Sequence, residues 1–565
     1  MSKKVIAMLA IASLFIVATG CSNKEANSNK TSVASKVEVD TTITLGDTID
    51  VDGEGVVVEK NKVTINSSGT YSISGTLRDG QIEVNAGDED NVQLILNGVN
   101  ITNSTSSGIY VANSKNTYVI LEDGTSNEVT DGENYIFEDI STDEPNAAIF
   151  SKSDLFISGT GSLKVNAKYN NGITSKDDLE IADGTISIDS VADGIRGRDS
   201  ITISSGNIII NSQGDGMKSN NDEDTEKGYV LIEGGTINIT SGEDGIQAET
   251  VATITGGDIT INSVDDSIHS NDKVEINGGT INIKSGDDGI HADSIIDINN
   301  GDITIAKSYE GIEAETININ NGNIKVTSSD DGVNASGGND GSSINGRPGQ
   351  NNFASAGKGT ININGGKIVV DASGDGLDAN GSIYMKDGTV IVNGPEDNGN
   401  GSLDYDGEFQ ITGGLLIAAG SSGMAQSPSE ISSQNSINIF SAIQANTIVR
   451  VEDSNGNEVV TFAPSKNVQS LVISSANIKI GETYNVYTGG TSTGSVNDGI
   501  YSEGSYLDGT ELESFTVSGV VTNIGEVTGG FGGSGAGMQG QGGGFPGGER
   551  PTQGEFPGGE MPARP

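Results

Sequence analysis

The sequence contains no tryptophan, one cysteine and two histidines, and aromatic residues make up only 4% of its 565 positions. Aromatic content this low is unusual for the core of an ordinary globular domain, and it favours a narrow aliphatic core. A single cysteine excludes a disulfide within one chain, so an exported form must gain its rigidity in another way. The 82 glycines and 10 prolines stay below the fraction that is typical of a chain disordered throughout.

Basic residues are also scarce in this sequence. The 30 lysines and arginines are far outnumbered by 78 aspartates and glutamates, and the formal net charge is −48. Nucleic acids and anionic lipid surfaces are poor partners for such a chain, because they carry negative charge themselves. The plain interpretation of this acidity is solubility outside the cell. Acidic residues that recur in an ordered pattern indicate a further role.

The N-terminal segment indicates export. Lys3 and Lys4 precede an apolar run, Val5 to Val17, which is too short to span a membrane as a mature helix. The segment from Ala18 to Cys21 then resembles the cleavage site of a bacterial lipoprotein, although Ala18 stands where leucine is common. We expect cleavage before Cys21 and a lipid on its sulfur, which anchors the chain at the extracellular face of the cytoplasmic membrane. The alternative is an ordinary signal peptide with an incidental cysteine.

The middle of the chain repeats the pattern acid-Gly-apolar about every 22 residues. We call its acidic positions the ladder: Asp193, Asp215, Asp244, Asp266, Asp288, Glu310, Asp331 and Asp375. Asn171 stands one step earlier, and the steps from it are 22, 22, 29, 22, 22, 22, 21 and 44 residues. A fixed period in this range is typical of a solenoid, in which each repeat is one coil stacked on the next.

Each repeat predicts short strands. Between Asp244 and Asp266 the apolar residues recur with a period of two, in pieces of three to five residues. Glycine pairs such as Gly256-Gly257 separate the pieces and supply positive φ for tight turns. We therefore expect an all-β fold, a parallel β-helix with coils of three strands and 22 residues. A right-handed sense is favoured, because parallel crossovers are almost always right-handed.

The pattern changes along the chain, and it predicts six segments. They are a signal peptide (1–20), a flexible tether (21–40), irregular N-terminal coils (41–145), the β-helix core (146–430), a C-terminal β cap (431–525) and a disordered Gly/Pro-rich tail (526–565). A polar insertion at 336–359 is expected to form a mobile loop beside the core.

The ladder predicts bound calcium. Stacked coils place successive ladder acids about 4.8 Å apart, where like charges repel unless a cation bridges them. Ca²⁺ takes oxygen ligands in irregular geometry and suits such a site. The expected ligands are Asp215, Glu243, Asp244, Asp265, Asp266, Asp287, Asp288, Asp330, Asp331, Asp375 and Asp378. The alternative is that these carboxylates only cap turn amides and face solvent.

The strand after each ladder acid presents one outward position per coil. We call this set the contact column: Arg196, Lys218, Gln247, His269, His291, Glu313, Asn334 and Asp378. Its residue types vary from coil to coil, as they do on a binding surface. Columns that point inward need similar side chains in every coil in order to stack. The two histidines with Asp266, Asp288 and Asp293 could bind a transition metal, but the favoured interpretation is a long polar surface.

The Asp-Asp-Gly-Ile and Gly-Gly-x-Ile-x-Ile coils, the lipoprotein start and the Gly-rich tail together resemble a known family. It is the clostridial carbohydrate-binding β-helix family, whose characterised member binds cellulose and pectin and has calcium ions. The resemblance spans 41–530 and is strongest over 171–394. It implies a lipid-anchored protein, expected to be monomeric, that binds polysaccharide through Arg196 to Asn334 of the contact column. Without tryptophan that surface must be polar, which favours pectin-type uronates over cellulose; Tyr309, Tyr384 and Tyr405 are the aromatic candidates.

The same resemblance raises catalysis as an alternative, because the family is similar in fold to the calcium-dependent pectate lyases of polysaccharide lyase family 9. Those enzymes use an Asp-Asp-x-x-Asp cluster and a lysine base. No copy here keeps the full cluster, since His291 or Asn334 replaces its third acid. Lys218 is the best candidate base, but neighbouring carboxylates raise a lysine pKa and oppose that role. Binding without cleavage is therefore expected; a structural adhesin or spacer is the other alternative.

Overall fold

The computed structural model describes residues 38–137, 141–336 and 358–525. All regular structure there is β, in 52 strands, which confirms the all-β prediction. No helix in the described part of the chain is long and apolar enough to cross a membrane. The predicted signal peptide, Cys21 and the tail from 526 lie outside the described residues, as do nearly all of the tether and the insertion.

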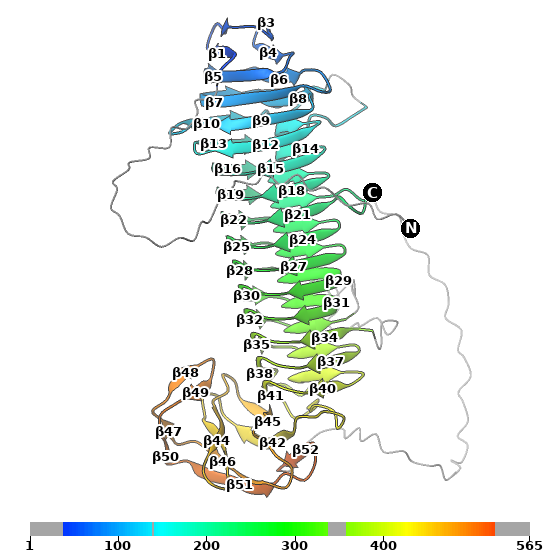
Figure 1. Ribbon diagram of the computed structural model, residues 1–565, viewed down its shortest axis with the longest axis vertical. Helices are drawn as coiled ribbons and strands as arrows, with labels where there is room; N and C mark the ends of the chain where they lie inside the picture. The colour runs from blue at the N-terminus through cyan, green and yellow to red at the C-terminus, as the bar shows by residue number, and fades with distance from the viewer. Residues whose placement is uncertain (1–37, 138–140, 337–357, 526–565) are drawn as a thin grey trace, which may run out of the picture.

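The long column of strands in Figure 1 begins with seven strands of mixed direction. They are β1 (Thr41–Leu45), β2 (Asp50–Asp52), β3 (Val56–Glu59), β4 (Lys62–Ile65), β5 (Gly69–Leu77), β6 (Gln81–Asn85) and β7 (Asn91–Thr102). The pairs β1–β2 and β3–β4 are antiparallel, whereas β1–β5–β7 and β4–β6 are parallel. The parallel stack therefore starts within this first segment.

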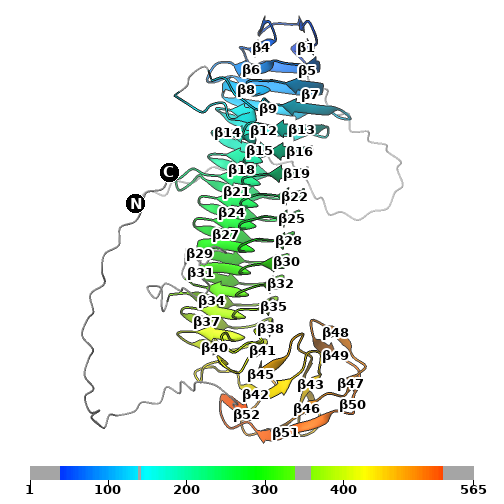
Figure 2. The same cartoon turned by 180° about the vertical axis from the view of Figure 1, so that it is seen from behind.

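Three rows of parallel strands follow, and each strand pairs with its counterpart in the next coil (Figures 1 and 2). The first row is β8 (Ile109–Asn113), β11 (Ala147–Ser151), β14 (Asn171–Ser175), β17 (Ile195–Gly197), β20 (Met217–Ser219), β23 (Ile246–Ala248), β26 (Ile268–Ser270), β29 (Ile290–Ile298), β31 (Ile312–Ile319), β33 (Val333–Ala335), β36 (Leu377–Ala379) and β39 (Leu403–Tyr405). It carries the contact column.

The second row continues through the later halves of β29 and β31. Its other members are β9 (Asn116–Leu121), β12 (Asp154–Gly159), β15 (Asp178–Ile181), β18 (Ser200–Ile203), β21 (Tyr229–Ile232), β24 (Val251–Ile254), β27 (Lys273–Ile276), β34 (Thr360–Ile363), β37 (Ser382–Met385) and β40 (Phe409–Ile411). The third row is β10 (Ser126–Thr130), β13 (Ser162–Ala167), β16 (Thr185–Ser190), β19 (Asn207–Ser212), β22 (Thr236–Thr240), β25 (Asp258–Asn262), β28 (Thr280–Lys284), β30 (Asp302–Ser308), β32 (Asn323–Ser328), β35 (Lys367–Ala372), β38 (Thr389–Asn393) and β41 (Leu415–Gly420). This long parallel sheet is compatible with a β-helix.

Isoleucines in register form the core between the rows. Ile246 pairs with Ile268, and Ile268 pairs with Ile290, and all three are fully buried. The glycine that follows the ladder acid is closely packed, although Ser267 takes its place in one repeat. A Cβ on Gly245 would lie 2.4 Å from Ile261 Cγ2 and 2.5 Å from the Ser267 carbonyl oxygen. A side chain at Gly245 would therefore push neighbouring coils apart.

The three parallel rows end at β41. The remaining strands are β42 (Ser436–Ile443), β43 (Val449–Asp453), β44 (Glu458–Phe462), β45 (Val468–Ser474), β46 (Thr483–Thr488), β47 (Thr491–Ser492), β48 (Ser495–Asn497), β49 (Ile500–Ser502), β50 (Tyr506–Leu507), β51 (Thr510–Thr516) and β52 (Val521–Ile524). The only parallel pair among these later described strands is β42–β52. β45 pairs antiparallel with both β41 and β42, and six other strands form a second sheet. A second apolar cluster joins this sheet to the end of the long one, with Val451 and Phe462 from the former and Ile417 and Leu471 from the latter. β45 thus occupies the free edge that β41 would otherwise expose.

Candidate functional site

One oxygen of most ladder carboxylates joins neighbouring coils. The Asp266 backbone N–H donates to Asp244 Oδ1 at 3.1 Å, and the Asp288 N–H donates to Asp266 Oδ1 at 2.9 Å. The same bond links Asp193 to Asp215, Asp215 to Asp244, Asp288 to Glu310 and Asp331 to Asp375. The ladder acids from Asp193 to Glu310 are buried, so these bonds pair amides that water does not reach. One oxygen of these carboxylates therefore accepts a hydrogen bond from a backbone amide, as the capping interpretation expects.

The second oxygen of each early ladder acid faces a basic side chain of the contact column. Asp193 Oδ2 lies 3.4 Å from Arg196 Nη1, and Asp215 Oδ2 lies 2.6 Å from Lys218 Nζ. Burial lowers the pKa of Lys218, but the hydrogen bond and charge of Asp215 outweigh burial, and the pKa is raised. Lys218 is therefore held protonated, which opposes a role as a base.

The two histidines take this place in the next coils. His269 Nδ1 lies 3.0 Å from Asp244 Oδ2, and His291 Nδ1 lies 3.0 Å from Asp266 Oδ2. Burial lowers the pKa of His291, but its hydrogen bond to Asp266 and the nearby charges of Asp266 and Glu313 raise it to about 9. At neutral pH, His291 therefore adds a positive charge to this part of the ladder.

Beyond His291 the contact column turns acidic or neutral, and it becomes buried. Glu313 is 2% exposed and accepts a hydrogen bond from Ser336 Oγ at 2.6 Å; Asn334 is 3% exposed and donates to Glu310 Oε2 at 2.7 Å. This corrects the prediction that Glu313 and Asn334 lie on an accessible surface, because hydrogen bonds hold both side chains between the coils. Arg196, Lys218, Gln247, His269 and His291 remain partly exposed.

A cluster of three carboxylates lies where the column is acidic. One oxygen from each of Asp331, Asp375 and Asp378 lies within 4.8 Å of the others. None of the ion pairs among the described residues involves these three side chains. Burial, followed by the charges of neighbouring carboxylates, raises the pKa of Asp331 and Asp378 well above the usual range. Burial also raises the pKa of Asp375 to about 7. Three oxygen donors without a basic partner fit a hard cation such as Ca²⁺.

A second acidic cluster combines Asp265, Asp266 and Asp287. Asp287 Oδ1 is buried and has no hydrogen-bond partner among the described residues, and burial raises the pKa of Asp287 to about 7. The other expected calcium ligands are placed differently. Asp215 and Asp244 are paired with Lys218 and His269, Asp288 lies near His291 and Glu313, and Glu243 and Asp330 belong to neither cluster.

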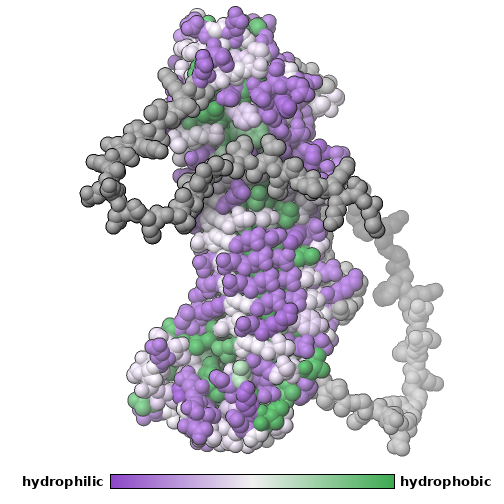
Figure 3. All heavy atoms as spheres, viewed as in Figure 1, coloured by the Kyte–Doolittle hydropathy of each residue, from purple (hydrophilic) through white to green (hydrophobic). Residues whose placement is uncertain are grey.

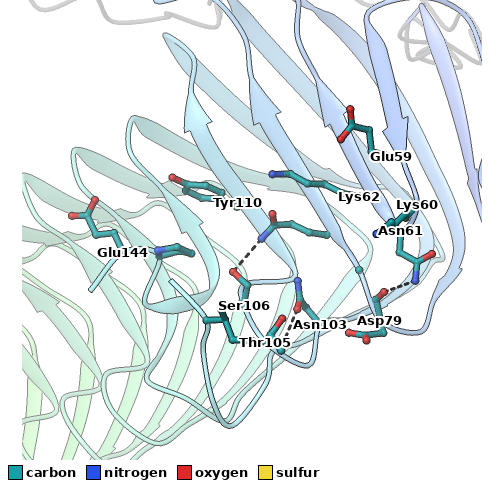
Figure 4. Close-up of a pocket in the computed structure, with 14 residues that line it drawn as sticks. Glu59, Lys60, Asn61, Lys62, Asp79, Asn103, Thr105, Ser106, Tyr110 and Glu144 are labelled. Carbon is teal, nitrogen blue, oxygen red and sulfur yellow. Dashed lines mark hydrogen bonds between the residues drawn. The ribbon is translucent and has the colours of Figure 1, made fainter. Parts of the chain in front are cut away.

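The register of the contact column continues towards the N-terminus beyond the repeat, but its next two positions, Thr174 and Phe150, are buried. Arg196 pairs in register with Thr174, Thr174 with Phe150, and Phe150 with Tyr110. Tyr110 lines a pocket of about 480 Å³ together with Lys62 and other polar residues, including Gln81, Asn103 and Ser106 (Figure 4). The sequence did not reveal Tyr110, because its spacing of 40 residues to Phe150 breaks the period. The predicted aromatic candidates lie elsewhere: Tyr384 is in the second row, and the Tyr405 hydroxyl donates to the Ser427 carbonyl.

Hydrophilic side chains are frequent on the face of the stacked coils that Figure 3 shows. The extended row of single side chains, one per coil, differs from the enclosed apolar pocket that a small ligand usually requires.

Comparisons with known proteins point to carbohydrate. A family model described as "Carbohydrate-binding domain-containing protein" matches residues 59–311 and 274–350, together more than half of the chain. A relative with the same description, from Acetivibrio thermocellus, is 40% identical over 174 residues, which are 30% of this chain and 59% of the relative. The match thus covers less than two thirds of the relative. A solved structure, the polysaccharide lyase-like protein from C. thermocellum as a gadolinium derivative, has 36% identity and a TM-score of 0.40, and the match covers 46% of this chain and 97% of that chain.

Proposed function

The chain belongs to the family of carbohydrate-binding domain-containing proteins, and on that premise we propose that it binds an acidic, pectin-type polysaccharide along the stacked coils with the help of calcium. The observation that carries this proposal is the contact column. Arg196, Lys218, Gln247, His269 and His291 place one polar side chain on each of five successive coils, in register. A row of this kind suits a polymer, which meets equivalent contacts along its length.

Charge explains how an acidic protein holds an acidic glycan. The basic members of the contact column, Arg196 and Lys218, offer direct partners for uronate groups, although both are already shared with ladder acids. At the other end, the cluster of Asp331, Asp375 and Asp378 holds Ca²⁺, which neutralises the carboxylates and has coordination positions left for a uronate. Without bound cations, a net charge of −48 repels a polyuronate.

The proposal is binding without cleavage. A lyase needs a base with a lowered pKa, and Lys218 is instead held protonated by Asp215. We further propose that a lipid on Cys21 anchors the protein outside the cell, and that the coils wind in the right-handed sense that parallel crossovers favour.

The test is binding to immobilised polygalacturonate, with cellulose as a second polymer, in calcium and in chelator. Calcium-dependent retention on polygalacturonate is expected, and retention that ignores the chelator contradicts the bridging role of calcium. Gln247→Ala in the contact column should weaken binding. Asn238→Ala is the matched control, because this exposed amide lies on the third row of a neighbouring coil. Equal effects of the two substitutions would indicate that the binding surface lies outside the contact column.

A further inference from the structure

The two histidines of this 565-residue chain are next to each other in space. His269 lies in β26 and His291 in β29, and the two residues pair in register across neighbouring coils. Their rings are stacked, with centroids 5.0 Å apart and planes inclined by 10°. Because the contact column changes residue type at almost every coil, this pair is a local feature and does not follow from the repeat.

The carboxylate of Asp266 lies beside both rings. Its Oδ2 is 3.0 Å from His291 Nδ1 and 3.9 Å from His269 Nδ1, and the three potential ligand atoms all lie within 4.8 Å of one another. The side chains are 9%, 16% and 20% exposed for Asp266, His291 and His269. Asp266 Oδ1 is held by the Asp288 N–H, so the group that would bridge the rings is already oriented.

Hydrogen bonding leaves His291 incompletely satisfied. Its Nδ1 faces Asp266, but its Nε2 is buried and has no hydrogen-bond partner among the described residues. Asp293 Oδ1 lies 3.8 Å from this nitrogen, which is beyond hydrogen-bond distance. A metal ion at Nδ1 would leave the ring neutral and place the positive charge among carboxylate oxygens.

The donor set differs from that of the acidic clusters, although Asp266 also belongs to the cluster with Asp265 and Asp287. Two imidazole nitrogens and one carboxylate oxygen suit borderline transition metals such as Zn²⁺, Ni²⁺ or Cu²⁺, whereas all-oxygen sites suit Ca²⁺. We propose that Asp266, His269 and His291 bind one transition-metal ion through Asp266 Oδ2 and the two Nδ1 atoms. The ladder then holds two classes of metal, selected by the residue that the contact column presents in each coil. This site goes beyond the proposed carbohydrate function and does not depend on it.

The test is calorimetric titration of Zn²⁺, and separately Ni²⁺, into the full chain without an affinity tag and in saturating calcium. One high-affinity equivalent is expected for the wild type. His269→Gln or His291→Gln should weaken it at least tenfold, and the double substitution should abolish it. Glutamine suits this position, since Gln247 occupies it in the preceding coil. Equal melting temperatures in chelator would establish that the variants fold.

Visible absorption of the Co²⁺-loaded protein gives an independent readout, since nitrogen ligands produce ligand-field bands that the double variant should lack. Asp378→Asn is the matched control: it should weaken calcium binding and leave Zn²⁺ binding unchanged. No Zn²⁺ binding above calcium-saturated background, or equal binding by the double variant, would overturn the proposal. Failure of the wild-type chain to bind polygalacturonate would count against the carbohydrate function and leave the metal site standing.

Discussion

Replacing Asp375 by asparagine should stabilise the fold in the absence of calcium, and calcium should reduce that gain. Asparagine has the same shape and retains an oxygen for the hydrogen bond that Asp375 Oδ1 accepts from the Gly401 N–H. The substitution therefore removes one negative charge from the cluster of Asp331, Asp375 and Asp378 and leaves the packing intact. It also replaces one of the three charged carboxylate ligands of the expected cation site with a neutral amide.

The magnitude follows from the raised pKa of Asp375. Burial is the largest cause, and the pKa rises from 3.8 to about 7. A carboxyl with a higher pKa in the folded chain binds its proton more tightly there, so its stabilising effect is complete below about pH 4 and is lost as the pH rises to about 7. The free energy of unfolding should fall by roughly 4 kcal/mol over that window in the absence of a cation.

In chelator at pH 8, Asp375→Asn should therefore unfold at a higher temperature than the wild type, and the difference should vanish near pH 4. In calcium the advantage of the variant should shrink, because the wild type gains roughly 2.7 kcal/mol at a hundredfold excess over Kd and the variant gains less. The assay is denaturant or thermal unfolding at both pH values, each in EDTA and in calcium. Asp258→Asn, at an exposed position of the third row, is the control. A loss of stability that is equal in EDTA and in calcium would refute the reasoning.

Three further outcomes are expected. Gly245→Ala should lower the free energy of unfolding by about 1–3 kcal/mol or more, because its Cβ would collide with Ile261 and the Ser267 carbonyl; Gly519→Ala, with its nearest atom at 3.7 Å, should have little effect in the same denaturant titration. Calorimetry should find calcium binding weakened more by Asp378→Asn than by Asp183→Asn, whose carboxylate lies outside both clusters and accepts the Gly184 N–H; equal losses would contradict the assignment. Incubation with polygalacturonate and calcium should yield no absorbance from unsaturated product, and an increase that Lys218→Ala abolishes would establish a lyase instead.

The repeat made much of the fold predictable. A period of two within strands and a period near 22 between coils place Ile246, Ile268 and Ile290 in one column, and the structure buries all three in register. Glycine pairs marked the turns, and Gly235, Gly257 and Gly279 have φ of 94°, 101° and 96°. Such features are local or strictly periodic, so they can be predicted from the sequence alone.

The opening coils were less predictable. Tyr110 and Phe150 belong to the same row as Arg196, but insertions between them remove the period that would align them. Which residues align between coils of unequal length depends on which strands pair. The spacing of motifs in the sequence does not show this pairing.

The sequence alone determined that carboxylates and a variable polar column run side by side along the coils, because both recur at one position per repeat. Only the tertiary structure decided what each side chain contacts. Lys218 pairs with the acid of its own coil, whereas His291 lies closest to the acid of the coil before, and Glu313 and Asn334 are buried. Side-chain length and competition between neighbouring hydrogen-bond partners control these choices, and both act across coils, where a one-dimensional pattern carries no information.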